Sequence, residues 1–135
     1  MPELTYDYAV VRVVPRVERE EFLNAGIILF SKPAGVLEAK VALDEARLAA
    51  LAPGEDPGPI REHLASVERI AEGGADAGPV GQLSQSQRFH WLTAPRSTVI
   101  QVSAVHAGLC EDPERELVRL FARLVTRAGE ESGTG

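Results

Sequence analysis

The sequence predicts an α+β fold in which an antiparallel sheet of about five strands carries helices mainly on one face. Short apolar and β-branched segments, typical of strands, occur in the first third of the chain and again before residue 110. Two longer segments repeat apolar residues at spacings of three and four, which is typical of amphipathic helices. The expected order along the chain is βββααββα, and residues 1–135, 44% of them hydrophobic, suit a single domain with one core.

Three strands are predicted in the first third of the chain. Residues 6–14 are rich in valine, residues 23–30 form a nearly continuous apolar run, and residues 36–42 follow after a short turn. Gly26 interrupts the second run, and an interior glycine indicates a bulge or the close approach of another element. The polar residue Asn24 at the start of this run is therefore assigned to a turn or bulge; the alternative is a functional amide at the strand entrance.

Three helices are predicted from their first residues and apolar spacing. Asp44 can cap a short helix that ends at residue 51. Pro59 suits the first turn of a second, stronger helix. Asp112, followed by Pro113, opens the last helix in the same way.

Two further segments lack both periodic patterns. Residues at about 73–86 include a glycine-rich run and are predicted to form a flexible loop. Residues at about 130–135 are predicted to form a disordered tail.

The segment 88–110 is predicted to be a polar β-hairpin, with strands at 89–93 and 98–106. It contains no acidic residue although the chain carries a net charge of −6, so an anionic ligand or acidic partner would dock here. A turn with an arginine, hydroxyl groups and free amides can hold a phosphate or carboxylate; the alternative is a turn with a solvated arginine. The candidate anion-binding residues are Arg96, Ser97, Thr98, Gln101, Ser103 and His106.

Four arginines follow one another at i, i+4 spacing on the last predicted helix. Like charges at this spacing repel, so either an acidic partner or RNA offsets them, or neighbouring glutamates and the helix dipole do so on a solvated face. The residues of this candidate partner-binding stripe are Arg115, Arg119, Arg123 and Arg127.

The sequence contains no catalytic motif and no metal-ligand spacing that we recognise. His106 and Cys110 lie four residues apart, which allows a histidine-activated thiol; the alternative is a packed thiol and a structural histidine. His63 is assigned to the edge of the core. We therefore predict no catalytic residue, no metal and no cofactor.

The composition limits the cellular compartment and the kinds of partner that we expect. The chain has one cysteine, no signal-peptide pattern and no apolar run near the ~20 residues of a bilayer span, which predicts a cytoplasmic protein without a membrane segment. Its net negative charge argues against non-specific binding to nucleic acid.

Several motifs resemble, in order, a known bacterial family. They are Tyr6-Asp-Tyr-Ala-Val-Val-Arg-Val-Val-Pro15, Asn24-Ala-Gly-Ile-Ile-Leu-Phe30, Trp91-Leu-Thr-Ala-Pro-Arg-Ser-Thr98 and His106-Ala-Gly-Leu-Cys110. Over residues 6–125 the chain is similar to the family catalogued as domain of unknown function 3037 (DUF3037). The resemblance brings no established activity, but it implies an accessory or regulatory role beside a kinase-like protein of the HipA type.

Three function classes follow. The first is a non-catalytic protein-interaction or regulatory module, whose partner is another protein, kinase-like according to the resemblance. The alternative is a small hydrolase or nucleotide-processing enzyme that uses the polar segment 88–110. The third is nucleic-acid binding through the arginine stripe. A deep pocket containing His106 and Arg96 would favour the enzyme, and a flat apolar patch would favour the module. The oligomeric state stays open.

Overall fold

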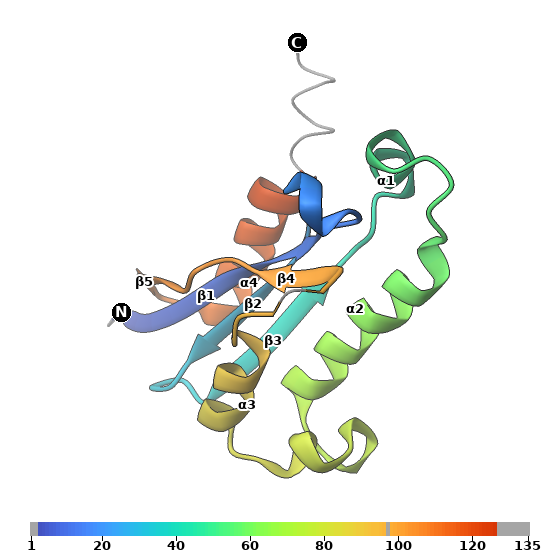
Figure 1. The fold of residues 1–135 in the computed structure, drawn as a ribbon. Helices are drawn as coiled ribbons and strands as arrows, with labels where there is room; N and C mark the ends of the chain where they lie inside the picture. Colours follow the sequence, from blue (N-terminus) through green and yellow to red (C-terminus); the bar gives the residue numbers. More distant parts are fainter. Residues whose placement is uncertain (1–2, 97, 127–135) are drawn as a thin grey trace.

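In the described part of the chain, a five-stranded antiparallel sheet is combined with four α-helices (Figure 1). The computed structural model describes residues 3–96 and 98–126. The strands are β1 (Leu4–Val13), β2 (Leu23–Ser31), β3 (Val36–Val41), β4 (Ile100–Val102) and β5 (His106–Cys110), and the helices are α1 (Glu45–Leu51), α2 (Pro57–Glu72), α3 (Gln85–Leu92) and α4 (Pro113–Phe121). The predicted α+β class and the antiparallel sheet are confirmed.

Strands β4 and β5 share one neighbour. The sheet order is β3-β2-β1-β4, and β5 also pairs with β1, so that β4 lies opposite residues 11–13 and β5 opposite residues 4–8. Between them, the N–H of Ser103 donates to the carbonyl of Val10 (2.9 Å), and the N–H of Val10 donates to Ser103 Oγ (2.8 Å). The predicted strand at 98–106 is therefore an interrupted edge strand that continues to Cys110.

The predicted strand at 89–93 is wrong, because these residues belong to α3 and its C-terminal end. Ser84 caps this helix: its Oγ accepts from the N–H of Gln87, and the Gln87 side chain accepts from the N–H of Ser84. Phe89 and Leu92, three residues apart, are both buried on one side of the helix. The predicted hairpin at 88–110 therefore does not form, and the segment instead runs from a helix into an edge strand.

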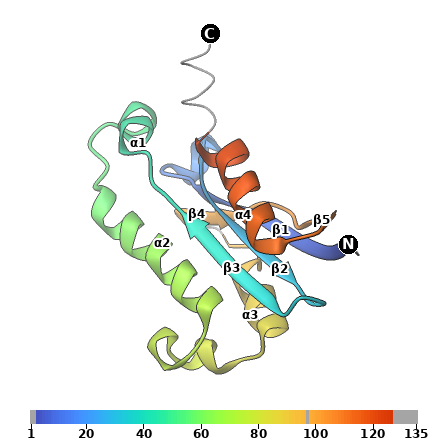
Figure 2. The ribbon, with the colours of Figure 1, turned by 180° about the vertical axis from the view of Figure 1, so that it is seen from behind.

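Helices cover both faces of the sheet. Helices α1, α2 and α3 enclose one core, which contains Leu48, Ile60 and Phe89. Helix α4 encloses a second core on the opposite face through Leu117, Leu120 and Phe121 (Figure 2). The expectation of helices mainly on one face therefore describes α1–α3, while α4 adds a second layer that the sequence did not indicate.

A bulge in β2 shifts the alternation of the strand, so that Leu23 and Ala25 before the bulge face the same core as Ile28 and Phe30 after it. The register shifts where Val11 lies opposite Gly26 and Arg12 lies opposite Asn24, so that Ala25 is the extra residue. A Cβ atom at Gly26 would lie 2.7 Å from Cγ1 of Val41 on β3. Both parts of the expectation for Gly26, a bulge and a close approach, are confirmed.

The connection between α2 and α3 winds around a buried arginine. Two 3-10 turns occur in it, at Ala75–Ala77 and Pro79–Gln82, within the stretch predicted as a flexible loop. Arg88 is 8% exposed and donates to the carbonyls of Leu83 (2.6 Å) and Ala71 (3.3 Å). The predicted tail at 130–135 lies outside the described residues.

Candidate binding sites

Arg96 lies in the segment that leads from α3 to β4. Its Nη2 donates to the carbonyl of Trp91 (2.8 Å) and its Nη1 to the carbonyl of Leu92 (3.2 Å). The guanidinium also lies 4.5 Å from the centre of the Trp91 ring. Arg96 is therefore held against the C-terminal end of α3, where carbonyl groups lack helical partners and a positive charge is favourable.

The other predicted anion-binding residues do not converge on one point. Thr98 Oγ1 donates to the carbonyl of Ile100 (2.8 Å), and Gln101 Nε2 donates to the carbonyl of Thr98 (3.0 Å). Ser103 is buried and forms two hydrogen bonds with the backbone of Val10. His106 is exposed and lies beside Tyr8, with the ring centres 5.3 Å apart. Ser97 lies outside the described residues.

A cavity of about 310 Å³ is lined by Arg96 and Gln101 and also by Arg12, which was not among the candidate residues predicted from the sequence. Arg12 lies on β1 directly opposite Gln101 on β4. The signal available in the sequence was an arginine inside a run of valines, at a position where a strand has no obvious use for charge. The lining residues are Arg12, Val14, Val17, Glu20, Phe22, Arg96 and Gln101.

Arg12 forms no ion pair in the described part of the chain. Its guanidinium lies 4.3 Å from the centre of the Phe22 ring. Its Nε is buried and has no hydrogen-bond partner among residues 3–96 and 98–126, and the ion pairs formed by those residues involve other arginines. Glu20, which lines the same cavity, has a φ of 56°, a left-handed conformation that is uncommon outside glycine.

A second candidate surface is the outer edge of β5. On one side this strand pairs with β1; the pairing found among the described residues leaves its other side without a strand. Residues 106–110 contain no charge and no proline. Leu109 is 57% exposed and Val105 is 46% exposed, so apolar side chains accompany the open backbone.

The charge around the Cys110 end of β5 is negative. Burial, and then the charges of Glu116, Asp112 and Glu3, raise the pKa of the Cys110 thiol, which disfavours the thiolate. His106 is four residues away on the same strand, roughly 13 Å at about 3.3 Å per residue. The two side chains are therefore too far apart for the histidine to activate the thiol. No group of three or more potential metal ligands occurs in the part of the chain that the structure describes.

The arginine stripe is uneven. Arg119 donates to both carboxylate oxygens of Glu116 (2.6 and 3.0 Å), while Arg115 and Arg123 are exposed on the same helical segment. Arg127 lies outside the described residues. The stripe therefore has one arginine whose charge is already balanced, which weakens it as a continuous basic surface.

Glu116 also joins α4 to the sheet. The hydroxyl of Tyr6 on β1 donates to Glu116 Oε2 (2.5 Å). Burial, and then this hydrogen bond, raise the pKa of Tyr6, while the hydrogen bond from Arg119 is the main cause that lowers the pKa of Glu116. This cluster of three side chains joins α4 to β1.

The described residues form an α+β fold with an open sheet edge at β5 and a cavity lined by two arginines. The chain belongs to the family described as "Protein of unknown function (DUF3037)", which matches residues 8–125. No curated protein and no solved structure matches the chain. Among the described residues, no helix is both long and apolar enough to cross a bilayer.

Proposed function

We propose that this domain is a non-catalytic protein-interaction module of the bacterial cytoplasm, which binds an extended segment of another protein along the edge of β5. The observation that carries the proposal is the unprotected edge itself, with Val105 and Leu109 exposed beside it. Adding a strand to such an edge uses main-chain hydrogen bonds for affinity and alternate side chains for specificity.

The two edges of the sheet differ in protection. Folded proteins usually protect edges with charges, proline, bulges or a covering element. On β3, the strand carries Glu38 and Lys40, and the N–H of Val41 donates to Glu68 Oε2 on α2 (3.1 Å). β5 has none of these charges on its own residues. The difference supports β5 as the edge that receives a partner.

The side chains next to β5 specify the chemistry of the segment. Leu109 and Ala107 point away from α4, because Gly108 between them lies opposite Tyr6, which packs on the α4 side. The acids at the Cys110 end favour a basic residue there. We therefore propose a segment that pairs antiparallel to β5, with an apolar side chain next to Leu109 and a lysine or arginine next to Cys110.

The test selects peptides and maps where they bind. A displayed library of short peptides is selected against the full chain, and the amide exchange of residues 105–110 is measured with and without the best binder. The proposal expects alternating apolar and basic peptides that slow exchange in β5. Binders that leave β5 exchange unchanged would contradict it, as would a chain that already forms a β5-to-β5 dimer in solution.

Two variants of equal exposure sharpen the test. Leu109 and Val118 are each 57% exposed, but Val118 lies on the outer face of α4. Leu109→Lys is expected to weaken peptide binding about tenfold or more, because it adds a charge to the edge that repels the basic segment. Val118→Lys is expected to leave binding unchanged. The same pair, tested against a purified kinase-like protein of the HipA type, examines the partner that the family resemblance implies.

A catalytic role makes a different prediction. The purified chain is screened against phosphoester, ester, nucleotide and nucleic-acid substrates. Turnover that disappears in both His106→Ala and Arg96→Ala, while both variants stay folded, would overturn the non-catalytic assignment. The separation of these side chains, one on β5 and one at the end of α3, supports the expectation of no turnover.

A further inference from the structure

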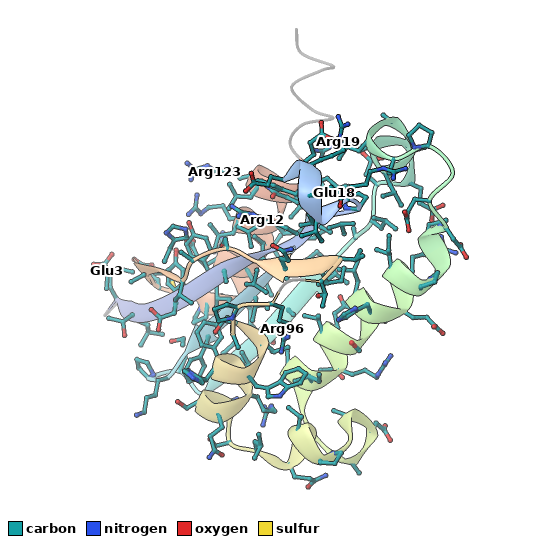
Figure 3. All side chains as sticks on the ribbon, viewed as in Figure 1. Glu3, Arg12, Glu18, Arg19, Arg96 and Arg123 are labelled. Carbon is teal, nitrogen blue, oxygen red and sulfur yellow. The ribbon has the colours of Figure 1, made fainter. Side chains whose placement is uncertain are left out.

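The cavity next to β4 shares no lining residue with β5, so it is a separate candidate site for a ligand. It lies between the β1–β2 connection and the segment that leads into β4. Its volume of about 310 Å³ falls at the small end of the range for small-molecule sites. In Figure 3, Arg12 and Arg96 lie on the two sides of β4. Two guanidinium groups and one carboxylate, that of Glu20, line the space, so its charge favours an anion.

Arg12 is already oriented but its charge is not balanced. Its Nε is buried and, among the described residues, has no acceptor. A buried donor without a partner is uncommon in folded proteins, and the cost of leaving Arg12 Nε unpaired supports a functional use for this guanidinium at the cavity that it lines. The Phe22 ring, 4.3 Å away, restricts the guanidinium, which reduces the entropy lost when a ligand binds.

Arg96 is held from the other side of β4. Two of its N–H groups donate to the carbonyls of Trp91 and Leu92, and its guanidinium lies over the Trp91 ring. Carbonyl groups orient the guanidinium without cancelling its formal charge. The two bonds leave three of the five N–H donors of this side chain without a recorded partner among the described residues.

The arrangement suits a phosphate monoester better than a carboxylate. One guanidinium fork satisfies a planar carboxylate, whereas a tetrahedral dianion directs its oxygens in several directions and can accept from two forks. Val14, Val17 and Phe22 supply an apolar wall for the organic part. We propose that this cavity binds a small phosphate monoester with an apolar or aromatic body, whose phosphate accepts from Arg12 and Arg96.

Glu20 provides an independent test of whether the ligand is negatively charged. Its carboxylate lines the cavity and opposes a bound dianion. Glu20→Gln keeps the size of the side chain and removes the charge, so phosphate binding should become about two- to fivefold tighter, as expected for a charge contact near the surface. A purely apolar cavity would not respond in this way.

The experiment titrates the full chain with phenyl phosphate, followed by calorimetry and by NMR. Benzoate, phenol and inorganic phosphate are the comparison ligands. Phenyl phosphate should bind most tightly, and Arg12→Gln and Arg96→Gln should each weaken it about tenfold or more, because each removes hydrogen bonds to a charged group. Arg69→Gln is the matched control, since Arg69 is exposed on α2 and lies off the cavity lining.

Four results would overturn the proposal. They are no saturable binding of phenyl phosphate, phenol binding as tightly, benzoate binding more tightly, and an equal loss in Arg69→Gln. Arg96 also stabilises the end of α3, so its substitution can lower the melting temperature. In that case Arg12→Gln decides, because Arg12 contacts the Phe22 ring but forms no ion pair with the described residues, and its Nε bonds to none of them.

Discussion

At the scale of single residues, Arg88 organises the connection between α2 and α3. It is buried, it binds two carbonyl groups, and its guanidinium lies against Gly73, the residue that ends α2. Gly73 has a φ of 79°, and a Cβ there would lie 2.8 Å from Arg88 Cζ. A side chain at position 73 should therefore displace the Arg88 guanidinium, which has no carboxylate partner in the described part of the chain.

Gly73→Ala is expected to lower the free energy of unfolding by about 2–4 kcal/mol, the sum of backbone strain in an extended conformation with positive φ and the displacement of Arg88. Gly78→Ala is the control: Gly78 has nearly the same backbone conformation (φ 73°, ψ −161°, against 79° and −179° at Gly73), but a Cβ there meets nothing within 4 Å. It should lose only the backbone strain, about 1–3 kcal/mol, and therefore less than Gly73→Ala. Urea denaturation measures both, and equal losses would show that the Arg88 contact contributes nothing.

The hydrogen bond from Tyr6 to Glu116 gives a pH-dependent prediction. Tyr6→Phe should lower the free energy of unfolding by about 1–3 kcal/mol at neutral pH, because a hydrogen bond to a charged acceptor is lost. Tyr8→Phe, in the same strand, should cost less than ~0.5 kcal/mol, because the Tyr8 hydroxyl makes no hydrogen bond with the described residues.

The sign of the pH dependence follows from the pKa of Glu116, which is lowered in the folded state. Its contribution to stability is present above the ordinary pKa of the carboxyl, 4.5, and is lost as the pH falls through the lowered folded value. The difference in the free energy of unfolding between the wild type and Tyr6→Phe should therefore shrink as the pH falls below the folded-state pKa of Glu116. Urea denaturation across this range checks it, and a constant difference would contradict the assigned bond.

At the scale of elements, α3 depends on Ser84, the residue that caps its N-terminus. Ser84→Ala removes the capping box and should cost about 1 kcal/mol, whereas Ser86→Ala, exposed in the first turn of the same helix, should be close to neutral. Thermal unfolding followed by circular dichroism measures the pair. A larger loss for Ser86→Ala would place the start of the helix elsewhere.

The elements that the sequence predicted correctly share a strong local signal. The β1–β3 strands are rich in β-branched residues, and Asp44 and Asp112 cap α1 and α4 as expected. Helix α3 was missed because its residues 89–93 mix aromatic and polar side chains over a stretch short enough to suit a strand. The capping box at Ser84 and Gln87 was the local signal that could have corrected it.

The cavity was only partly predictable. Arg96 and Gln101 come from the selected segment and do line it. Arg12 could not be placed beside them, because that requires the register of β1 against β4, a pairing between residues about 90 positions apart that no local pattern encodes. The separation of Ser103 and His106 likewise depends on how one edge strand is interrupted.

At the scale of the whole molecule, β2 couples the two cores. Ile27 and Leu29 face the α4 core, while Ile28 and Phe30 face the core under α2 and α3. Loosening one core must disturb the strand that supports the other. The domain should therefore unfold in a single transition even though its helices lie on opposite faces.

Phe121→Ala tests this coupling. It should cost about 3–5 kcal/mol, because Phe121 is buried in the α4 core. Trp91, the single tryptophan, lies on α3 at the other face and reports unfolding there. In Phe121→Ala, the denaturant midpoint followed by tryptophan fluorescence should fall by the same amount as the midpoint followed by circular dichroism. A fluorescence transition that stays in place while the circular dichroism becomes biphasic would show two independent cores.

The pairing of β1 on both sides has a consequence during synthesis on the ribosome. β2 follows β1 after a short connection, but β4 begins 87 residues after β1 ends, at Ile100 after Val13. At about 5–20 residues per second, roughly 4–17 s of translation separate these two strands. During that time the nascent chain exposes the free edge of an apolar valine-rich strand. Slow codons between residues 14 and 99 would lengthen this period of exposure, and a chaperone that binds nascent β1 would shorten it.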